Sequence, residues 1–539
     1  MPRIFERPVA PNLAYFAFAG LIAVLISAIQ LFDPINIYSY ERDAWHHLAT
    51  LNALMDSPFS ATNPHVVSDD PARTFMPWFV FLALLGKAFS LNAQQVLGVS
   101  ALLTMGLLVG GVYLFAREYF QKRWAPLVLF VCMIGPWGML FNHSGLYNIE
   151  TIIFSIGYPF GIVLAVGFFA WWSVLKCLDR QKLSLFHMAL IFSLPAFMFS
   201  THQLQAAFAI GAMITFALFA GQAPLARRLI ISAVTVAGTL FSSLWFYYNP
   251  FTMILLGSAQ SWQTNPYWYN PYFLVLMTGL AFMGFLGFYD LGRKKFRWEL
   301  VVGFGAIFIG FIVGGMLGNT ISHRFYPFWT LFLQMGMAAF LLSYAEFIRP
   351  PNFSGLRKFI FGTTAGLLAV LTVSHLQRGF ELYLFYTALG RGEVTTDLIN
   401  VSPYILDSVA RIKPLVGAGD VIIAHRQTAF PVQAHRMKVV SIPRPFPLVH
   451  DMAERQQASS DFFNPEISNK RRLEIIKKYH VSHILYRLSW LEEPIYRTLG
   501  AFGPQVTFND DLVLITIDSS AKERLTETSE VADTPGDSP

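Results

Sequence analysis

The sequence predicts a polytopic α-helical membrane protein that carries a small extracytoplasmic α/β domain at its C-terminus. Hydrophobic residues make up 54% of the 539 residues, and the mean hydropathy is +0.46. Charged residues make up only 13%, against roughly a quarter in soluble domains. The formal charge of +6 comes from short basic clusters between apolar runs rather than from one patch. Such clusters indicate membrane topology and argue against a nucleic-acid-binding surface.

Apolar runs near the length of a membrane crossing recur along the first two thirds of the chain. The first, at 12–32, is longer than a signal-peptide core and has no small-x-small cleavage site before Asp33. It is therefore expected to be an uncleaved signal anchor. The further runs are 96–116, 124–141, 151–175, 184–200, 203–221, 229–248, 271–289, 300–318, 325–347 and 358–376. Together they predict about eleven transmembrane helices.

The basic residues predict which side of the membrane each end of a span faces. Clusters follow every second run, at 117–123, 176–182, 227–228, 293–297 and 349–358, and Arg3 and Arg7 precede the first run. These segments are expected to be cytoplasmic, with the N-terminus. The segment at 75–90 cannot be a full span without reversing all later clusters, so we expect it to be half-inserted or interfacial on the outer face.

The chain is predicted to divide into three parts. Residues 1–376 form the transmembrane domain, in which 33–95 is the first outer loop with interfacial helices. Residues 377–518 form an extracytoplasmic α/β domain, because β-like runs at 420–425, 437–442, 482–488 and 512–517 alternate with helical stretches such as 465–480. Residues 519–539, rich in Ser, Thr, Glu, Asp and Pro, are expected to be disordered.

Polar residues that solvation does not explain collect in the outer loops. The first cluster is ERDAWHH, in which Glu41, Asp43, His46 and His47 follow the first span closely. A carboxylate at this boundary can face a lipid head group. Alternatively, Asp43 is the N-cap of a helix over 44–56, which shows an apolar stripe.

Three further clusters lie in later outer loops. The loop FNHSGLYNIE contains Asn142, His143, Asn148 and Glu150, and a carboxylate there needs a partner, water or a metal unless it only begins a helix. His202 lies in FSTHQLQ, and GNTISHRFYPF contains His323 and Arg324. An arginine at an outer span end is suited to hold a phosphate, and snorkelling to lipid phosphate is the alternative.

The loop from 245 to 272 is uncharged and aromatic, and includes Trp262, Tyr267 and Trp268. It predicts either an interfacial aromatic belt or a platform for a sugar ring or polyprenyl chain. No Walker loop, dinucleotide-binding glycine turn or GxSxG elbow occurs, so nucleotide-driven chemistry is not supported. Both cysteines, Cys132 and Cys177, belong to apolar runs, which excludes a disulfide framework.

The order of these parts resembles the GT-C superfamily of integral-membrane glycosyltransferases that use polyprenyl-phosphate-linked sugars. The chain begins with one span and a long outer loop that has an early acidic motif, ERDAWHH. Then come a hydrophobic segment, alternating spans, a late HRFYPF and an outward α/β domain. The resemblance extends loosely over the whole chain. It implies an enzyme of the bacterial inner membrane whose C-terminal domain is periplasmic or extracellular.

The resemblance also implies roles for residues. A catalytic carboxylate, Asp43 with Glu41 as the close competitor, would deprotonate an acceptor hydroxyl that attacks the anomeric carbon with inversion. The acceptor would be a glycan, a lipid or a protein. Cations at the departing phosphate stabilise its developing charge. Candidates for this role are Arg324 and His323, with His46, His143 and His202 as helpers. A divalent metal, Mg²⁺ or Mn²⁺, would be held by Glu150 with Asp43.

Three other functions remain open from the sequence. An outer-face ligase or polymerase of polyprenyl-diphosphate glycans would need the same cationic site and a larger groove. A transporter of lipid-linked sugars would need a polar path to the cytoplasm, where His187 is a poor beginning. A non-catalytic scaffold predicts that Asp43 and Arg324 can be replaced without loss of function.

Overall fold

The computed structural model describes residues 10–32, 43–138, 145, 147–179, 183–221, 223–257, 269–295, 297–318, 322–345, 355–390, 409–417, 419–425, 428–442 and 446–518. The chain divides into two compact units. The first, here called the membrane unit, combines Met1–Pro34 with Leu97–Leu384. The second, called the C-terminal lobe, combines Ile35–Val96 with Phe385–Pro539. The first outer loop therefore folds with the C-terminal region.

The membrane unit is built from helices alone within the residues described. They are α1 (Pro11–Phe32), α5 (Ala93–Phe120, which begins in the lobe), α6 (Ala125–Ile134), α7 (Ile149–Ser155), α8 (Pro159–Asp179), α9 (Leu185–Thr201), α10 (Gln203–Phe219), α11 (Leu225–Phe241), η1 (Ser242–Leu244), α12 (Pro250–Gly257), α13 (Pro271–Thr278), η3 (Gly279–Met283), α14 (Gly284–Lys295), α15 (Glu299–Met316), η4 (Ser322–Phe325), α16 (Tyr326–Ala345) and α17 (Gly355–Gly390).

Every apolar run predicted to span contains one of these helices, and seven helical segments among the described residues are long and apolar enough to cross a membrane. The predicted class, a polytopic α-helical membrane protein with a small C-terminal α/β domain, is confirmed. The number of eleven crossings stays a prediction.

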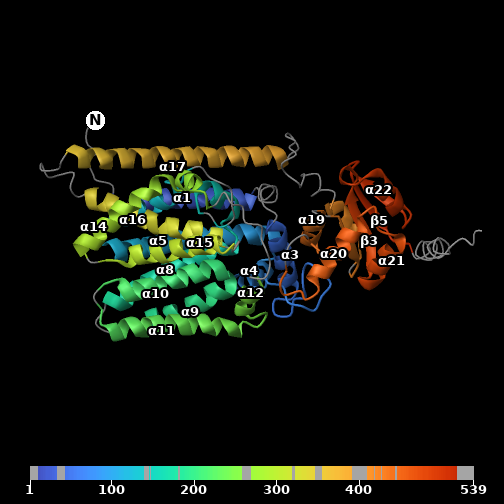
Figure 1. The fold of residues 1–539 in the computed structure, drawn as a ribbon, viewed down its shortest axis with the longest axis horizontal. Coiled ribbons are helices and arrows are strands. Elements are labelled where there is room, and N and C mark those ends of the chain that lie inside the picture. The colour runs from blue at the N-terminus through green and yellow to red at the C-terminus, as the bar shows by residue number, and fades with distance from the viewer. Residues whose placement is uncertain are drawn as a thin grey trace, which may run out of the picture. The chain divides into compact units, whose positions relative to one another are not determined.

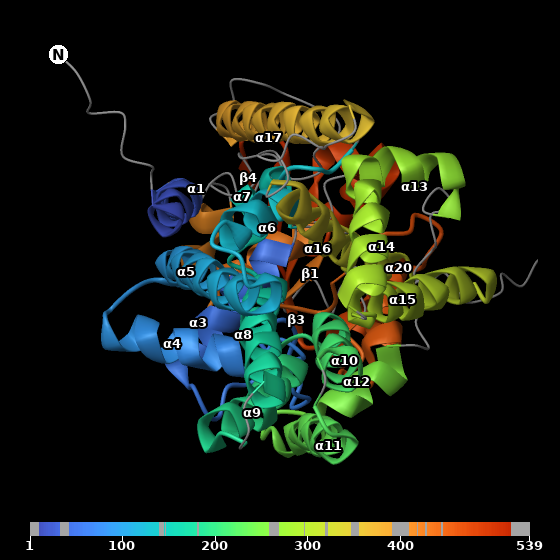
Figure 2. The ribbon, with the colours of Figure 1, turned by 90° about the vertical axis from the view of Figure 1, so that its left-hand side faces the viewer.

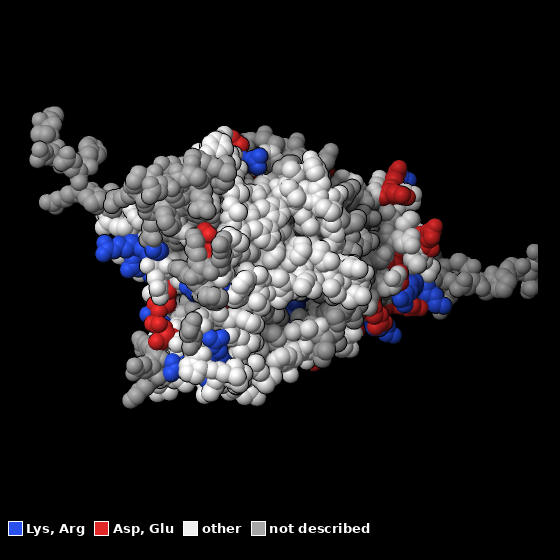
Figure 3. Space-filling model, turned by 60° about the vertical axis from the view of Figure 1, so that its left-hand side comes forward, with Lys and Arg blue, Asp and Glu red and all other residues white. Residues whose placement is uncertain are grey.

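Helices α8, α9, α10 and α11 pack on one another, and α16 packs against α6, α14 and α15 (Figures 1 and 2). Much of the membrane unit's surface in Figure 3 is without Lys, Arg, Asp or Glu. Exposed side chains on α11, α15 and α17 include Leu229, Ile309 and Val370. An uncharged, apolar exterior of this kind suits contact with lipid.

Two predicted spans are interrupted helices. The run at 151–175 breaks between α7 and α8, where a Cβ on Gly157 would stand 2.9 Å from the carbonyl oxygen of Leu97. The amide of Gln30 in α1 donates to the carbonyl of Ile153 at 2.8 Å, which satisfies a free acceptor at the end of α7. The second break lies at Gly279, whose φ of +54° favours glycine.

The predicted run 124–141 forms a shorter helix than expected, because α6 ends at Ile134 before the pair Gly135–Pro136. Proline has no backbone N–H, so Pro136 cannot donate the next hydrogen bond of the helix. The backbone N–H of Gly138, two residues later, donates to the carbonyl of Met277 at 2.8 Å, beside the break at Gly279. The irregular backbone of this segment is thus satisfied by α13, as it must be within a membrane protein.

The C-terminal lobe begins with two helices from the first outer loop, α3 (Asp43–Asp56) and α4 (Pro77–Ala88), which pack on each other. With 12 residues, α4 rises about 18 Å. That is short of the roughly 30 Å hydrocarbon core. This length agrees with the expectation that the segment does not span.

The rest of the lobe is the α/β part. Its elements are η6 (Lys413–Leu415), β1 (Val421–Ala424), α19 (Ala429–Ala434), β2 (Lys438–Val439), α20 (Met452–Phe462), α21 (Asn469–Lys478), β3 (Val481–Arg487), η8 (Leu488–Trp490), α22 (Glu493–Gly500), β4 (Gln505–Phe508) and β5 (Leu512–Thr516). The strand order is β2-β1-β3-β5-β4, with β1, β2 and β3 parallel and β4 and β5 antiparallel. A core that includes Ile423, Phe462, Ile476 and Ile484 joins the sheet to its helices.

Candidate functional site

Three of the segments singled out in the sequence meet inside the membrane unit. The hydroxyl oxygen of Tyr147, from the loop FNHSGLYNIE, lies 3.0 Å from the carbonyl oxygen of Pro327, which belongs to HRFYPF. It also lies 2.8 Å from Oε1 of Gln334, about two turns further into α16. Tyr147 is fully enclosed, and its ring packs edge-on against Trp137 at 5.0 Å. The loop before α7 is thereby fixed to the start of α16.

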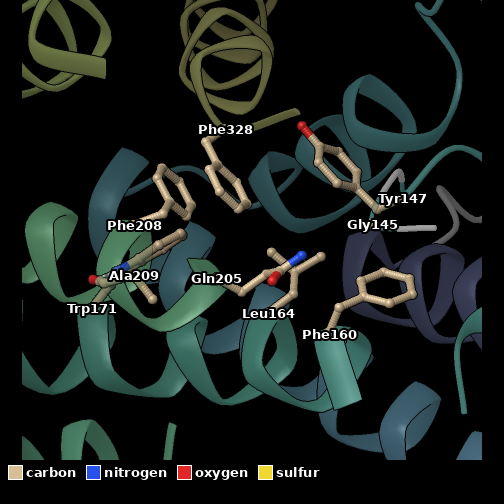
Figure 4. A pocket seen from close by; sticks show the side chains of 9 residues that line it. All are labelled: Gly145, Tyr147, Phe160, Leu164, Trp171, Gln205, Phe208, Ala209 and Phe328. Carbon is tan, nitrogen blue, oxygen red and sulfur yellow. Dashed lines mark hydrogen bonds between the residues drawn. The ribbon is translucent and has the colours of Figure 1, made fainter. Parts of the chain in front are cut away.

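The third segment, at the start of α10, completes this meeting point. Gln205 and Phe208 of α10 line a pocket together with Tyr147 and with Phe328 of α16. The rings of Phe208 and Phe328 stack at 4.3 Å. In Figure 4, Gln205 extends its amide into the middle of the group, between the aromatic rings at its two ends. Its Oε1 accepts no hydrogen bond from the described residues, although the side chain is buried.

The rest of the lining is Gly145, Ala209 of α10, and Phe160, Leu164 and Trp171 of α8, and it is largely apolar. The enclosed space is only about 10 Å³, room for about one water molecule. The three segments therefore pack closely here around one buried amide.

Glu150, at the start of α7, is paired with a residue of α17. Its Oε1 lies 2.7 Å from Nδ1 of His375, and both side chains are buried. Nε2 of His375 lies 2.7 Å from the carbonyl oxygen of Trp137. A carbonyl can only accept, so Nε2 carries a hydrogen. One further proton must then be shared between Nδ1 and the carboxylate, and the imidazole has no free nitrogen with which to act as a base.

Asp43 is the first residue of α3, where it is partly buried, and the apolar stripe predicted for 44–56 forms the buried face of that helix. His46, one turn later, is 3% exposed and packs against the rings of His65, Phe430 and Phe446 at 5.1 to 5.5 Å. His47 packs on Phe79 of α4 at 5.0 Å. The two adjacent histidines thus point to different neighbours.

The imidazole rings of His46 and His65 are both buried and are held in the neutral form. Burial lowers the pKa of His46 well below its ordinary value, and the neighbouring His65 and Arg73 lower it further. Burial also lowers the pKa of His65 to about 3, against the opposing effect of its hydrogen bond to Gln433. Neither ring is therefore a ready cation for a phosphate at neutral pH, and the helper role predicted for His46 stays a prediction.

The other candidate cations lie at helix ends of the membrane unit. His323 and Arg324 are partly buried in η4, directly before Tyr326, and His202 separates α9 from α10. Tyr269 is hydrogen-bonded to Ser322 in the same turn as Arg324. Five candidates, Glu41, His143, Trp262, Tyr267 and Trp268, lie outside the described residues.

No three His, Cys, Asp or Glu side chains gather as a metal site among the residues that the structure describes. Oε1 of Glu150 is engaged by His375. The metal role of Glu150 stays a prediction.

Four residues of these sites were missed in the sequence: Tyr147, Gln205, His375 and His65. Tyr147 and Gln205 lie inside the motifs FNHSGLYNIE and FSTHQLQ. Their uncharged polar side chains give no sign in the sequence that they form buried contacts. His375 carried a usable signal, because an ionisable residue within a predicted span suggests a function or a buried partner. His65 and its partner Gln433 are 368 positions apart, and no local pattern connects them.

No family model and no curated protein matches the sequence. Solved structures do match. ArnT from Cupriavidus metallidurans, in the apo state, is 13% identical with a TM-score of 0.53 over 94% of this chain and 99% of ArnT. The oligosaccharyltransferase AglB from Archaeoglobus fulgidus, in complex with an inhibitory peptide and a dolichol-phosphate, is 12% identical with a TM-score of 0.53 over 92% of this chain and 73% of AglB.

The arabinofuranosyltransferase AftD from Mycobacteria is 12% identical with a TM-score of 0.57, over 94% of this chain and 40% of AftD. At these identities the matches describe the fold. The fold of this chain is GT-C-like, as its motif order predicted.

Proposed function

We propose that this protein is a membrane glycosyltransferase that moves a sugar from a polyprenyl-phosphate donor to an extracytoplasmic glycan, lipid or protein. The observation that carries the proposal is the meeting of three predicted outer-face segments around the pocket of Tyr147, Gln205 and Phe328. Their packing brings the motif HRFYPF, which carries the proposed phosphate-binding residues, together with the loop before α7 and the start of α10. The fold likeness supports it, since ArnT has been solved with undecaprenyl phosphate bound.

In the proposed reaction Asp43 removes the proton of an acceptor hydroxyl, and that oxygen attacks the anomeric carbon. The bond to the phosphate oxygen breaks, and polyprenyl phosphate leaves with the electron pair. A positioned general base contributes roughly 100-fold to 10,000-fold to such a rate. Arg324 and His323 stabilise the departing phosphate by charge and hydrogen bonding.

The test is transfer activity in membranes that lack the protein and are resupplied with wild type, Asp43→Asn or Arg324→Ala. Lipid-linked sugars and surface glycans are followed by mass spectrometry. We expect Asp43→Asn to be expressed normally while one polyprenyl-phosphate sugar accumulates and one glycan residue disappears. Gln457→Leu, an exposed change on α20, serves as the control. If both active-site variants behave like wild type, the proposal is wrong and a scaffold or transporter takes its place.

A polyprenyl-diphosphate-glycan ligase is the second candidate. It predicts accumulation of a lipid-linked oligosaccharide rather than of a monosaccharide, so the same mass spectra distinguish the two reactions.

A further inference from the structure

The C-terminal lobe contains both the helix that begins at Asp43 and the sheet formed some 400 residues later. Residues from the first outer loop extend that sheet. Val66 forms a parallel bridge with Val439 of β2, and the N–H of Val439 donates to the carbonyl of His65 at 3.1 Å. Nη2 of Arg455 donates to the carbonyl of Val67 at 3.0 Å. Residues 63–70, here called the docked segment, thus lie along the edge strand.

The same contacts reach α3. Phe430 and Gln433 lie on α19, which packs against α3. Nδ2 of Asn52 in α3 donates to the carbonyl of Ala434 at 2.8 Å. The ring of His46 is enclosed by Phe430, Phe446 and His65. Because Asp43 and His46 are three residues apart on one helix, they share a face, and fixing the ring of His46 fixes the rotation of Asp43 about the helix axis.

Gln433 determines which way the His65 ring faces. Its Nε2 donates to the carbonyl of Ala429 at 2.9 Å, so its Oε1 is the atom that lies 2.5 Å from Nδ1 of His65. The amide oxygen can only accept, and Nδ1 of His65 must therefore carry the hydrogen. Both side chains are fully buried, so neither can exchange this bond for water.

We propose that Gln433 is a positioning residue: through His65 and His46, the C-terminal domain sets the orientation of α3 and hence of Asp43. This rests on the proposed function only in so far as Asp43 is the base. The α/β part of the C-terminal lobe then contributes to the catalytic geometry.

The experiment measures this orientation directly. Spin labels are attached to Asp43→Cys and to Glu474→Cys, an exposed position on α21 of the same lobe, in the full-length protein in nanodiscs. Both native cysteines, Cys132 and Cys177, are buried. The label-to-label distance distribution is recorded for the labelled protein with Gln433 unchanged and with Gln433→Met. This substitution keeps the side-chain length and removes the hydrogen-bond acceptor. Gln457→Leu is the matched control.

We expect Gln433→Met to broaden the distribution at least about twofold and Gln457→Leu to leave it unchanged. Replacing both partners, Gln433→Met with His65→Phe, restores the narrow distribution, because no buried donor is then left without an acceptor. With native Asp43 present, Gln433→Met lowers kcat by about tenfold or more while KM stays within about twofold, since displacement by about 1 Å can cost far more in rate than in binding.

If Gln433→Met gives the same distribution as the control, the positioning role is refuted, whatever the activity. If the distribution broadens while kcat is unchanged, Gln433 does orient α3, and the assignment of Asp43 as base is what fails. If Gln433→Met is not recovered in membranes, His65→Phe is the single variant, because it leaves the buried Oε1 of Gln433 without that donor. It must broaden the distribution, and the double variant must narrow it again. A narrow distribution in His65→Phe refutes the positioning role.

Discussion

Two segments of this protein are attached to their neighbours through polar contacts, one in the membrane unit and one in the C-terminal lobe. Helix α17 presents a buried face of Thr364, Leu368, Thr372, His375 and Gly379. The docked segment, 63–70, lies along β2 and is held by backbone pairing and by charged side chains. The first attachment combines one buried ionisable pair with close approaches at glycine, whereas the second uses backbone pairing and partly exposed charged groups.

The solvent explains this difference. Helix α17 is predicted to lie in lipid, whose tails are as apolar as leucine. Burying apolar surface would then not drive α17 onto its neighbours, and close approach and hydrogen bonds would do so. A Cβ on Gly135 would stand 2.1 Å from Oγ1 of Thr372, and one on Gly379 would stand 2.7 Å from Cδ1 of Ile153. The docked segment competes with water, so each contact contributes little and several are needed.

The largest effect should follow from breaking the pair in α17. His375→Ala leaves the Glu150 carboxylate buried without a partner, which costs about 3–5 kcal/mol. Replacing both, Glu150→Met with His375→Leu, should cost less than either single change, because no polar group is then stranded. Thermal unfolding in detergent measures the difference.

The matched control on the same helix is Gln377→Ala, which removes an exposed hydrogen bond to Glu381. We expect it to change the unfolding midpoint little. A His375→Ala variant that is as stable as this control would mean that the pair does not hold α17.

The sequence predicted α17 as a span but not its partner. Hydrophobicity is a local property, and it located the helices and most strands of the sheet. The sequence did not predict the helix break at Gly279, because glycine and threonine also occur within continuous transmembrane helices. Strand β4 was also missed, since its residues Gln505–Phe508 are mostly exposed and show no buried alternation.

Of the candidate site, the sequence identified the segments and missed the contacts. The loop before α7 and the motif HRFYPF were both recognised, and Tyr147 joins them through an uncharged hydroxyl. The pairing of Glu150 with His375 spans 225 positions, and that of the docked segment with β2 spans more than 370. Such contacts depend on how the elements pack, which local patterns do not contain.

A smaller effect is expected from removing one hydrogen bond of the docked segment. Val439→Pro deletes the N–H that donates to His65, whereas Val439→Ala keeps it. A net hydrogen bond contributes about 0.5–1.5 kcal/mol, so the proline variant should show roughly twofold to tenfold faster amide exchange in 63–70 than the alanine variant. Hydrogen exchange with mass spectrometry measures this. Equal exchange in the two variants would show that the segment does not depend on β2.

The smallest effect concerns the ion pair at the end of the docked segment, where Oδ2 of Asp70 lies 2.6 Å from Nδ1 of His450. Burial works to raise the pKa of Asp70, but hydrogen bonds from His450 outweigh it and hold the pKa below its usual value. The hydrogen bond to Asp70 raises the pKa of His450. The aspartate therefore stabilises docking above the ordinary carboxyl pKa of about 4, and the histidine does so below about 6.5.

It follows that the pair contributes most between about pH 4 and 6.5 and that its contribution is lost as the pH rises through the raised pKa of His450. Asp70→Asn should speed exchange of 63–70 by about twofold or less at pH 6, because an exposed pair is worth little. At pH 9 the variant should match wild type. At each pH, the exchange rate of 63–70 in the variant is divided by the rate in wild type. This ratio cancels the intrinsic exchange rate and the contribution of His65, which the two proteins share. A ratio that grows with pH would show that the protonated imidazole does not hold this end of the segment.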